Sequence, residues 1–131
     1  MIQKVHSVSY LAKAEFELNT GVHDLVALPA GAEVVKVSLE VKGAVNAMVN
    51  VGFKDASTKN YFLGVVLENG KIKEHVGIEG LNTITSARDY TATRNKVVVA
   101  DVKDSTSGQS GDARGILRVV YFLPSVIEVE Y

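Results

Sequence analysis

The sequence of 131 residues contains no cysteine and no tryptophan, and it has only two prolines and three histidines. Without cysteine, disulfides, thiolate metal ligands and cysteine nucleophiles are excluded, which is compatible with synthesis in a reducing cytoplasm. The histidines, His6, His23 and His75, share no metal-ligand spacing. We therefore predict no metal site and no cofactor.

An excess of charge of either sign is also missing, because 14 Lys and Arg stand against 15 Asp and Glu and the two signs are interleaved. This balance gives no reason to expect a nucleic-acid partner or an anionic membrane surface. No apolar run approaches the roughly 20 residues that cross a bilayer. Polar residues also interrupt the start of the chain, where a signal peptide would need an apolar stretch. We expect a soluble protein that binds neither nucleic acid nor membrane.

The sequence also lacks segments with the 3.6-residue period of a helix, and it shows instead the two-residue alternation of strands. The stretch "ALPAGAEVVKVSLEV", residues 27 to 41, opens with a corner in which Pro29 suits the second position and Gly31 the fourth position of a type I turn. After the corner every second residue is aliphatic, which predicts a strand with one buried face. The residues predicted for that face are Val35, Val37, Leu39 and Val41.

Further alternating segments predict strands over residues 14 to 18 and 47 to 53, and the pattern over 22 to 28 is ambiguous because both faces are partly apolar. Asn69-Gly70 between two extended segments predicts a type I′ hairpin. The expected cross-strand pairs are Glu68 with Lys71, Leu67 with Ile72, and Leu63 with Val76.

Polar segments separate these strands. Residues 54 to 60 and a glycine- and serine-rich stretch at about 103 to 115 are predicted loops, and 80 to 95 reads as a strand with an irregular connection. The runs 96 to 102 and 116 to 123 are apolar enough to be central strands. Together they predict one domain, residues 1 to 131, with an all-β fold: an antiparallel β-sandwich that is jelly-roll-like.

Catalytic constellations are not found. The carboxylate pairs Glu15 with Glu17 and Glu128 with Glu130 alternate with apolar residues, so they belong to solvated strand faces. We therefore predict that the protein is not an enzyme and name no catalytic residue. The aromatic residues leave one alternative open, because Tyr61 and Tyr90 fall outside the most apolar runs. They could stack a sugar, as in a carbohydrate-binding β-sandwich that attaches to a cell surface.

Two segments carry a family resemblance. "LPAGAEVVKVSLEV" followed by "VNVGFKDASTKNYFLGVV", with "LRVVYFL" as weaker support, resembles small structural proteins of tailed bacteriophages and prophages. The match covers about residues 25 to 67. It implies a head decoration, head-fibre or tail-associated protein, made in the cytoplasm of the bacterial host and located in the virion. Such a protein would act by self-assembly and by binding other virion proteins.

The tail "SVIEVEY", residues 125 to 131, alternates like a strand but lies beyond the strand expected to complete the sandwich. We predict that it is an oligomer interface in which Ile127, Val129 and Tyr131 face a neighbouring subunit, although the tail could instead dock on its own sheet. Symmetric subunits bury strand edges that would otherwise template aggregation. A homo-oligomer is therefore expected, with a trimer favoured.

Overall fold

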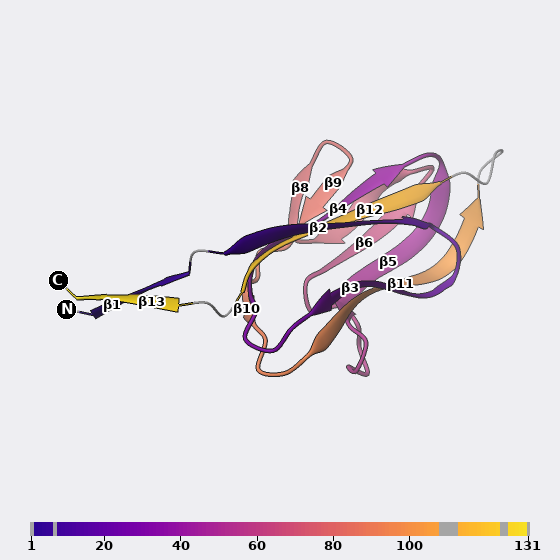
Figure 1. The fold of residues 1–131 in the computed structure, drawn as a ribbon. Coiled ribbons are helices and arrows are strands. Elements are labelled where there is room, and N and C mark those ends of the chain that lie inside the picture. The colour runs from indigo at the N-terminus through magenta and orange to yellow at the C-terminus, as the bar shows by residue number, and fades with distance from the viewer. Residues whose placement is uncertain (1, 7, 108–112, 124–125, 131) are drawn as a thin grey trace.

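The computed structural model describes residues 2–6, 8–107, 113–123 and 126–130, which form thirteen strands and no helix. Two antiparallel sheets pack face to face, and a separate two-stranded ribbon extends from one end of them (Figure 1). This arrangement confirms the predicted all-β antiparallel sandwich. Within the described part of the chain, no helix could span a membrane.

The strands divide between two sheets and the terminal ribbon. The first sheet contains β2 (Ser9–Glu17), β4 (Glu33–Lys42), β8 (Ile78–Gly80), β9 (Thr83–Thr85), β10 (Tyr90–Thr91) and β12 (Arg114–Phe122). The second sheet contains β3 (Gly21–Leu28), β5 (Val45–Phe53), β6 (Leu63–Glu68), β7 (Lys71–Val76) and β11 (Lys96–Ser107). The terminal ribbon consists of β1 (Ile2–His6) and β13 (Val126–Glu130).

Both runs that were predicted as central strands are central. β11 lies between β3 and β5, and β12 lies between β2 and β4. Their inward residues meet in a core made almost wholly of aliphatic side chains, because strand alternation sends every second residue to that side. Fully buried members of the core include Leu28, Leu39, Val49, Val51, Leu63, Val98, Leu117 and Val119.

The proline corner differs from the prediction. The Ala32 N–H donates to the Pro29 carbonyl at 3.1 Å, so Pro29 is the first and Gly31 the third residue of the turn. Gly31 has φ of 87°, which is the value that a type II turn requires at its third position and that glycine adopts without strain. The Gly31 N–H is also bound to the Ala92 carbonyl at 2.6 Å. The predicted type I turn was therefore wrong.

A β-bulge explains the one error in the predicted face of β4. Tyr121 pairs with Val34 and Val120 pairs with Lys36, so Val35 has no partner on β12. The extra residue exchanges the faces: Val34 is buried and Val35 is 44% exposed. The other three residues predicted for the buried face are buried, and they are Val37, Leu39 and Val41.

A second bulge resolves the ambiguous pattern of β3. Val98 pairs with Val26 and Val99 pairs with Asp24, which leaves Leu25 unpaired. Val26 is therefore buried on one side of the bulge, whereas beyond it the His23 ring lies 5.4 Å from the Phe16 ring. Because of the bulge at Leu25, even-numbered residues point inward after it and odd-numbered residues point inward before it, so apolar residues occur on both faces of the segment.

The Asn69-Gly70 hairpin is confirmed next to its turn. Both residues have positive φ, 57° and 77°, as type I′ requires. Glu68 pairs with Lys71 and Leu67 with Ile72, as predicted. The third predicted pair is wrong: an irregularity between Val66 and Leu67 shifts the register, so Val76 pairs with Gly64 and not with Leu63.

Strand pairing reaches into both ends of the predicted 103–115 loop. Thr106 pairs with Asn46 and Ser107 with Val45, so β11 continues past Lys103, and β12 already begins at Arg114. Residues 108–112 lie outside the described residues. Residues 54 to 60 form no strand, as predicted, and 80 to 95 contain the short strands β9 and β10 with irregular chain around them.

Candidate binding surface

The terminal ribbon is the feature of the fold that belongs to neither sheet. Its two strands are antiparallel, with register running from Ile2 opposite Glu130 to His6 opposite Val126. The Leu123 N–H donates to the Val8 carbonyl at 2.8 Å, which continues the β2–β12 pairing toward the ribbon. The ribbon is thus an extension of the β2–β12 strand pair beyond the sandwich, and it carries both ends of the chain away from the body (Figure 1).

Strand alternation gives the ribbon two unlike faces. Paired residues of an antiparallel ribbon share a face, so Val5 with Ile127 and Gln3 with Val129 belong to one face. Lys4 with Glu128 belongs to the other. The register thus places three aliphatic residues and Gln3 on the first face, and it places Ile2 and Val126 beside the charged residues on the second.

Such a ribbon needs further contacts. An isolated two-stranded ribbon is marginally stable in water, and each of its open edges presents unpaired backbone N–H and C=O groups. In Figure 1 the ribbon lies clear of both sheets, so neither sheet covers its faces. Within the described residues, the two strands of the ribbon pair only with each other.

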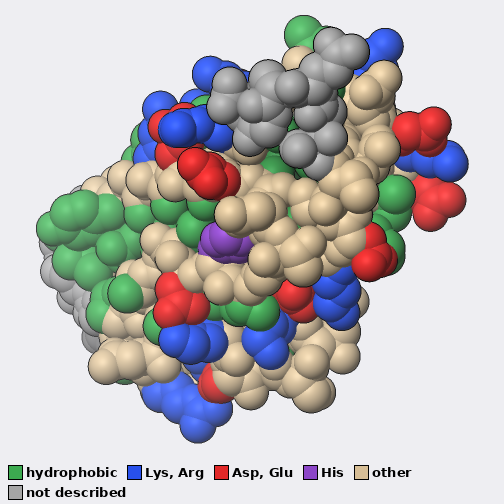
Figure 2. All heavy atoms as spheres, turned by 90° about the vertical axis from the view of Figure 1, so that its right-hand side faces the viewer, with side chains coloured by type: hydrophobic (Ala, Val, Ile, Leu, Met, Phe, Trp, Pro, Cys, Tyr) green, Lys and Arg blue, Asp and Glu red, His purple; other side chains and the backbone are tan. Residues whose placement is uncertain are grey.

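Exposed apolar side chains continue from the ribbon onto its base. Val5 is 38%, Tyr10 50% and Leu11 61% exposed, and Val8 between them is also exposed. The Tyr10 ring stacks on Tyr121 with 5.9 Å between centroids. At the opposite end of the sandwich, Figure 2 shows acidic and basic side chains spread over much of the visible face, with hydrophobic side chains gathered at one side.

The predicted interface residues fall on this ribbon in part. Ile127 and Val129 lie in β13, and Tyr131 lies outside the described residues. The tail pairs with β1 of its own chain, and not with an edge of either sheet. β1 was not predicted, because Ile2 with Lys4 and Gln3 with Val5 each mix an apolar with a polar residue and so lack the alternation of a half-buried strand. The interface role of these residues stays a prediction.

Tyr61 and Tyr90, the residues proposed to stack a sugar, do lie together. Their rings are 5.4 Å apart and meet edge to face, and both contact Phe53, at 5.2 and 4.5 Å. The Tyr61 hydroxyl donates to the Asp89 carbonyl at 3.2 Å, and the Arg88 guanidinium lies 5.2 Å from the Tyr61 ring centroid. The two half-buried rings form an aromatic cluster at the edge of the core, and their role in stacking a sugar stays a prediction.

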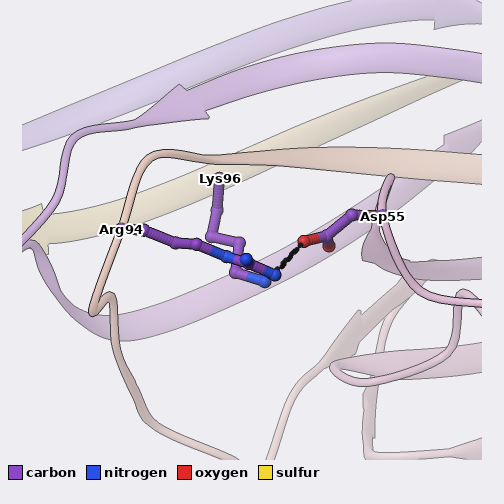
Figure 3. A network of polar contacts seen from close by, with 3 residues as sticks. All are labelled: Asp55, Arg94 and Lys96. Atoms are coloured by element: carbon purple, nitrogen blue, oxygen red, sulfur yellow. Dashed lines mark hydrogen bonds and ion pairs between the residues drawn. The ribbon is translucent and has the colours of Figure 1, made fainter.

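A network of charged side chains ties the turn after β5 to the start of β11 (Figure 3). Asp55 Oδ2 accepts from Lys96 Nζ at 2.7 Å and from Arg94 Nη2 at 2.9 Å. The hydrogen bond from Lys96, helped by the positive charge of both partners, lowers the pKa of Asp55 against the opposing effect of desolvation. Lys96 also lies 5.3 Å from the Phe53 ring centroid. The network fixes a loop to the sandwich, which is a structural task.

A similar ion pair lies on the outer face of the first sheet. Arg118 Nη1 of β12 donates to Glu40 Oε1 of β4 at 2.7 Å. This hydrogen bond, with the charge of Arg118, lowers the pKa of Glu40.

Groups suited to catalysis or metal binding are scattered across the described residues. Within them no cluster of three or more His, Asp or Glu could hold a metal ion. His23 contacts the Asn19 carbonyl at 2.9 Å and His75 lies 3.6 Å from Glu79, so these two rings have local partners. Glu15, one of the paired carboxylates, lies 3.3 Å from Arg114.

The described residues thus form an antiparallel sandwich with a two-stranded ribbon projecting from it. Comparison with solved structures finds this fold in bacteriophage capsids. A chain of the acid-stable capsid of Helicobacter pylori bacteriophage KHP30 is 56% identical, with a TM-score of 0.83 over 100% of both chains. The protein therefore belongs to the family of this phage capsid chain. It is a structural protein of a bacteriophage virion and is located there, as the resemblance implied.

Two further capsid chains share the fold. A chain of the cyanophage Pam1 capsid is 20% identical, with a TM-score of 0.56 over 88% of this chain and 85% of that one. A chain of the Ralstonia phage GP4 capsid is 18% identical, with a TM-score of 0.56 over 92% and 88%. No protein-family model and no curated protein matches the sequence.

Proposed function

We propose that the protein is a decoration protein of the phage head, which acts by assembling with copies of itself and by binding other virion proteins. The terminal ribbon carries this proposal. It is a two-stranded element with open edges, and it stands clear of the sandwich that the chain folds for itself. In a virion, neighbouring subunits supply the surface that such an element lacks.

The strand order supports a jelly roll, a fold that viral capsid domains use. Four strands of the first sheet run β2-β12-β4-β9 and four of the second run β3-β11-β5-β6. Strands that are consecutive in the chain, such as β2 and β3 or β11 and β12, lie in opposite sheets. The two sheets therefore interleave as the two Greek keys of a jelly roll do.

A closed homo-oligomer follows from the same reasoning, with a trimer as the first choice. Closed symmetry buries strand edges, and a threefold oligomer matches the threefold positions of a phage shell. Ile127, Val129 and Tyr131 would face the neighbouring subunit, together with Val5, which shares the face of Ile127 and Val129.

Light scattering after size exclusion tests the self-assembly. We expect a particle of three times the chain mass of 14.1 kDa. A mass near 14.1 kDa that does not change with concentration contradicts the proposal.

Binding to other virion proteins needs a separate test. Purified protein is added to phage particles that lack it, and the particles are sedimented. We expect the protein in the pellet at a fixed ratio to the major shell protein. Protein that remains in the supernatant contradicts this part of the proposal.

A further inference from the structure

The turn between β6 and β7 contains the only asparagine of the sequence that is followed by glycine, at Asn69-Gly70. A two-residue hairpin turn leaves the N–H groups of its two central residues without a partner inside the hairpin. Here both N–H groups are bound to another part of the chain. The Asn69 N–H donates to Asn46 Oδ1 at 2.8 Å, and the Gly70 N–H donates to the Val45 carbonyl, also at 2.8 Å.

These two hydrogen bonds fix the turn to the start of β5, where Val45 and Asn46 are the first two residues. The chain just before β5 is close as well, because a Cβ on Gly70 would overlap the carbonyl oxygen of Gly43. We call this set of contacts the turn clamp. The side chain of Asn69 remains exposed to water.

An asparagine followed by glycine can react with its own backbone, because glycine has no side chain to hinder the approach of its nitrogen. The Gly70 nitrogen gives its proton to a solvent base and bonds to Asn69 Cγ. The bond from Cγ to the side-chain nitrogen then breaks and ammonia leaves, which produces a succinimide ring. Water opens this ring at either of its two carbonyl carbons and yields aspartate or isoaspartate. The reaction consumes one water and needs no other reagent.

We propose that Asn69 is a deamidation site and that the turn clamp controls its rate. While the Gly70 N–H donates to the Val45 carbonyl, its proton is held and its peptide plane is fixed. The nitrogen then cannot turn toward Asn69 Cγ. The reaction therefore proceeds from the fraction of molecules in which the clamp is locally open.

The isoaspartate product opposes closure of the clamp. It inserts one CH₂ group into the backbone of a turn in which Gly70 already lies against Gly43. The aspartate product keeps the backbone and adds one negative charge next to Glu68. Conversion to isoaspartate therefore holds the turn open.

Three full-length chains, incubated at mildly alkaline pH, test this inference. They are the parent, Asn46→Ala, which removes the acceptor of the Asn69 N–H, and Asn95→Ala. The last is the matched control, because Asn95 Oδ1 accepts from the Ala30 N–H at 2.9 Å and so makes the same kind of bond to another turn. Far-UV circular dichroism verifies that all three are folded. A sample of the parent in guanidinium chloride gives the rate without a clamp.

Digestion and mass spectrometry measure the conversion of each asparagine, and enzymatic methylation of isoaspartate identifies the product. In the unfolded parent we expect Asn69 to convert faster than any other asparagine. In the folded parent it should convert at least roughly tenfold more slowly. Asn46→Ala should raise the folded rate at Asn69 about fivefold, which is the factor for the loss of one hydrogen bond, and Asn95→Ala should leave it unchanged.

Three results contradict the inference. If Asn69 converts no faster than the other asparagines in the unfolded chain, it is not a preferred site. If it converts as fast in the folded parent as in the unfolded parent, the turn clamp does not protect it. If Asn46→Ala matches the folded parent, or if Asn95→Ala accelerates Asn69 equally, the clamp does not control the rate.

Discussion

The sandwich body and the terminal ribbon are built from the same kind of alternating strand, yet their strands are stabilised differently. In the body, residues such as Leu39 and Leu117 pair across strands and are fully buried against the opposite sheet. The two strands of the ribbon pair only with each other within the described chain and lie clear of both sheets (Figure 1). The comparison shows that the body buries its own apolar residues, and it is the reason why we propose that the ribbon depends on a neighbour.

The largest effect on stability should come from the centre of the body. Leu117→Ala removes a fully buried side chain between Ala14 and Leu39 and leaves a cavity. We expect a loss of about 2 to 5 kcal/mol in the free energy of unfolding, measured by denaturant titration. Val5→Ala in the ribbon is the counterpart, with an expected change within about 0.5 kcal/mol. Equal losses of unfolding free energy in the two variants would contradict the proposed difference between body and ribbon.

A smaller effect is expected at the hairpin turn. Gly70 has φ of 77°, and a Cβ there would lie only 1.9 Å from the Gly43 carbonyl oxygen. Gly70→Ala should therefore cost about 1 to 3 kcal/mol, from backbone strain and this clash. Asn69→Gly at the neighbouring position, where φ is 57°, is the control and should change the free energy of unfolding far less.

The sequence predicted the features of the body that depend on local chemistry. Asn69-Gly70 prefers one turn type by itself, and the alternation of Val37, Leu39 and Val41 needs no knowledge of the neighbouring strands. The bulges at Leu25 and Val35 could not be found in this way. Each is a mismatch in length between two strands that are distant in sequence, so it becomes visible only when both are paired.

The candidate surface was predicted less completely for a related reason. The tail was recognised as a strand without a place in the sandwich, but its partner β1 lies at the other end of the chain.

A still smaller effect concerns pH and the network at Asp55. Its pKa is lowered in the folded state by Lys96, so the unfolded chain binds the proton more readily. The contribution of the network is therefore fully present above the ordinary carboxyl pKa of about 4 and is lost as pH falls through the lowered folded value. The difference in stability between parent and Asp55→Asn should shrink over that range, as followed by melting temperature. A difference in stability that grows as pH falls would contradict the claim that ionised Asp55 stabilises the fold.

The division between body and ribbon is tested most directly by measuring mass and fold on the same samples of the Ile127→Asp, Val129→Asp variant. The account predicts that light scattering gives the single-chain mass of 14.1 kDa, whereas the parent gives three times that value. It also predicts that the far-UV circular dichroism spectrum of the sandwich is retained. A variant that keeps the mass of the parent, or that loses its β-sheet spectrum together with its assembly, would contradict the claim that the ribbon serves assembly and the body folds without it.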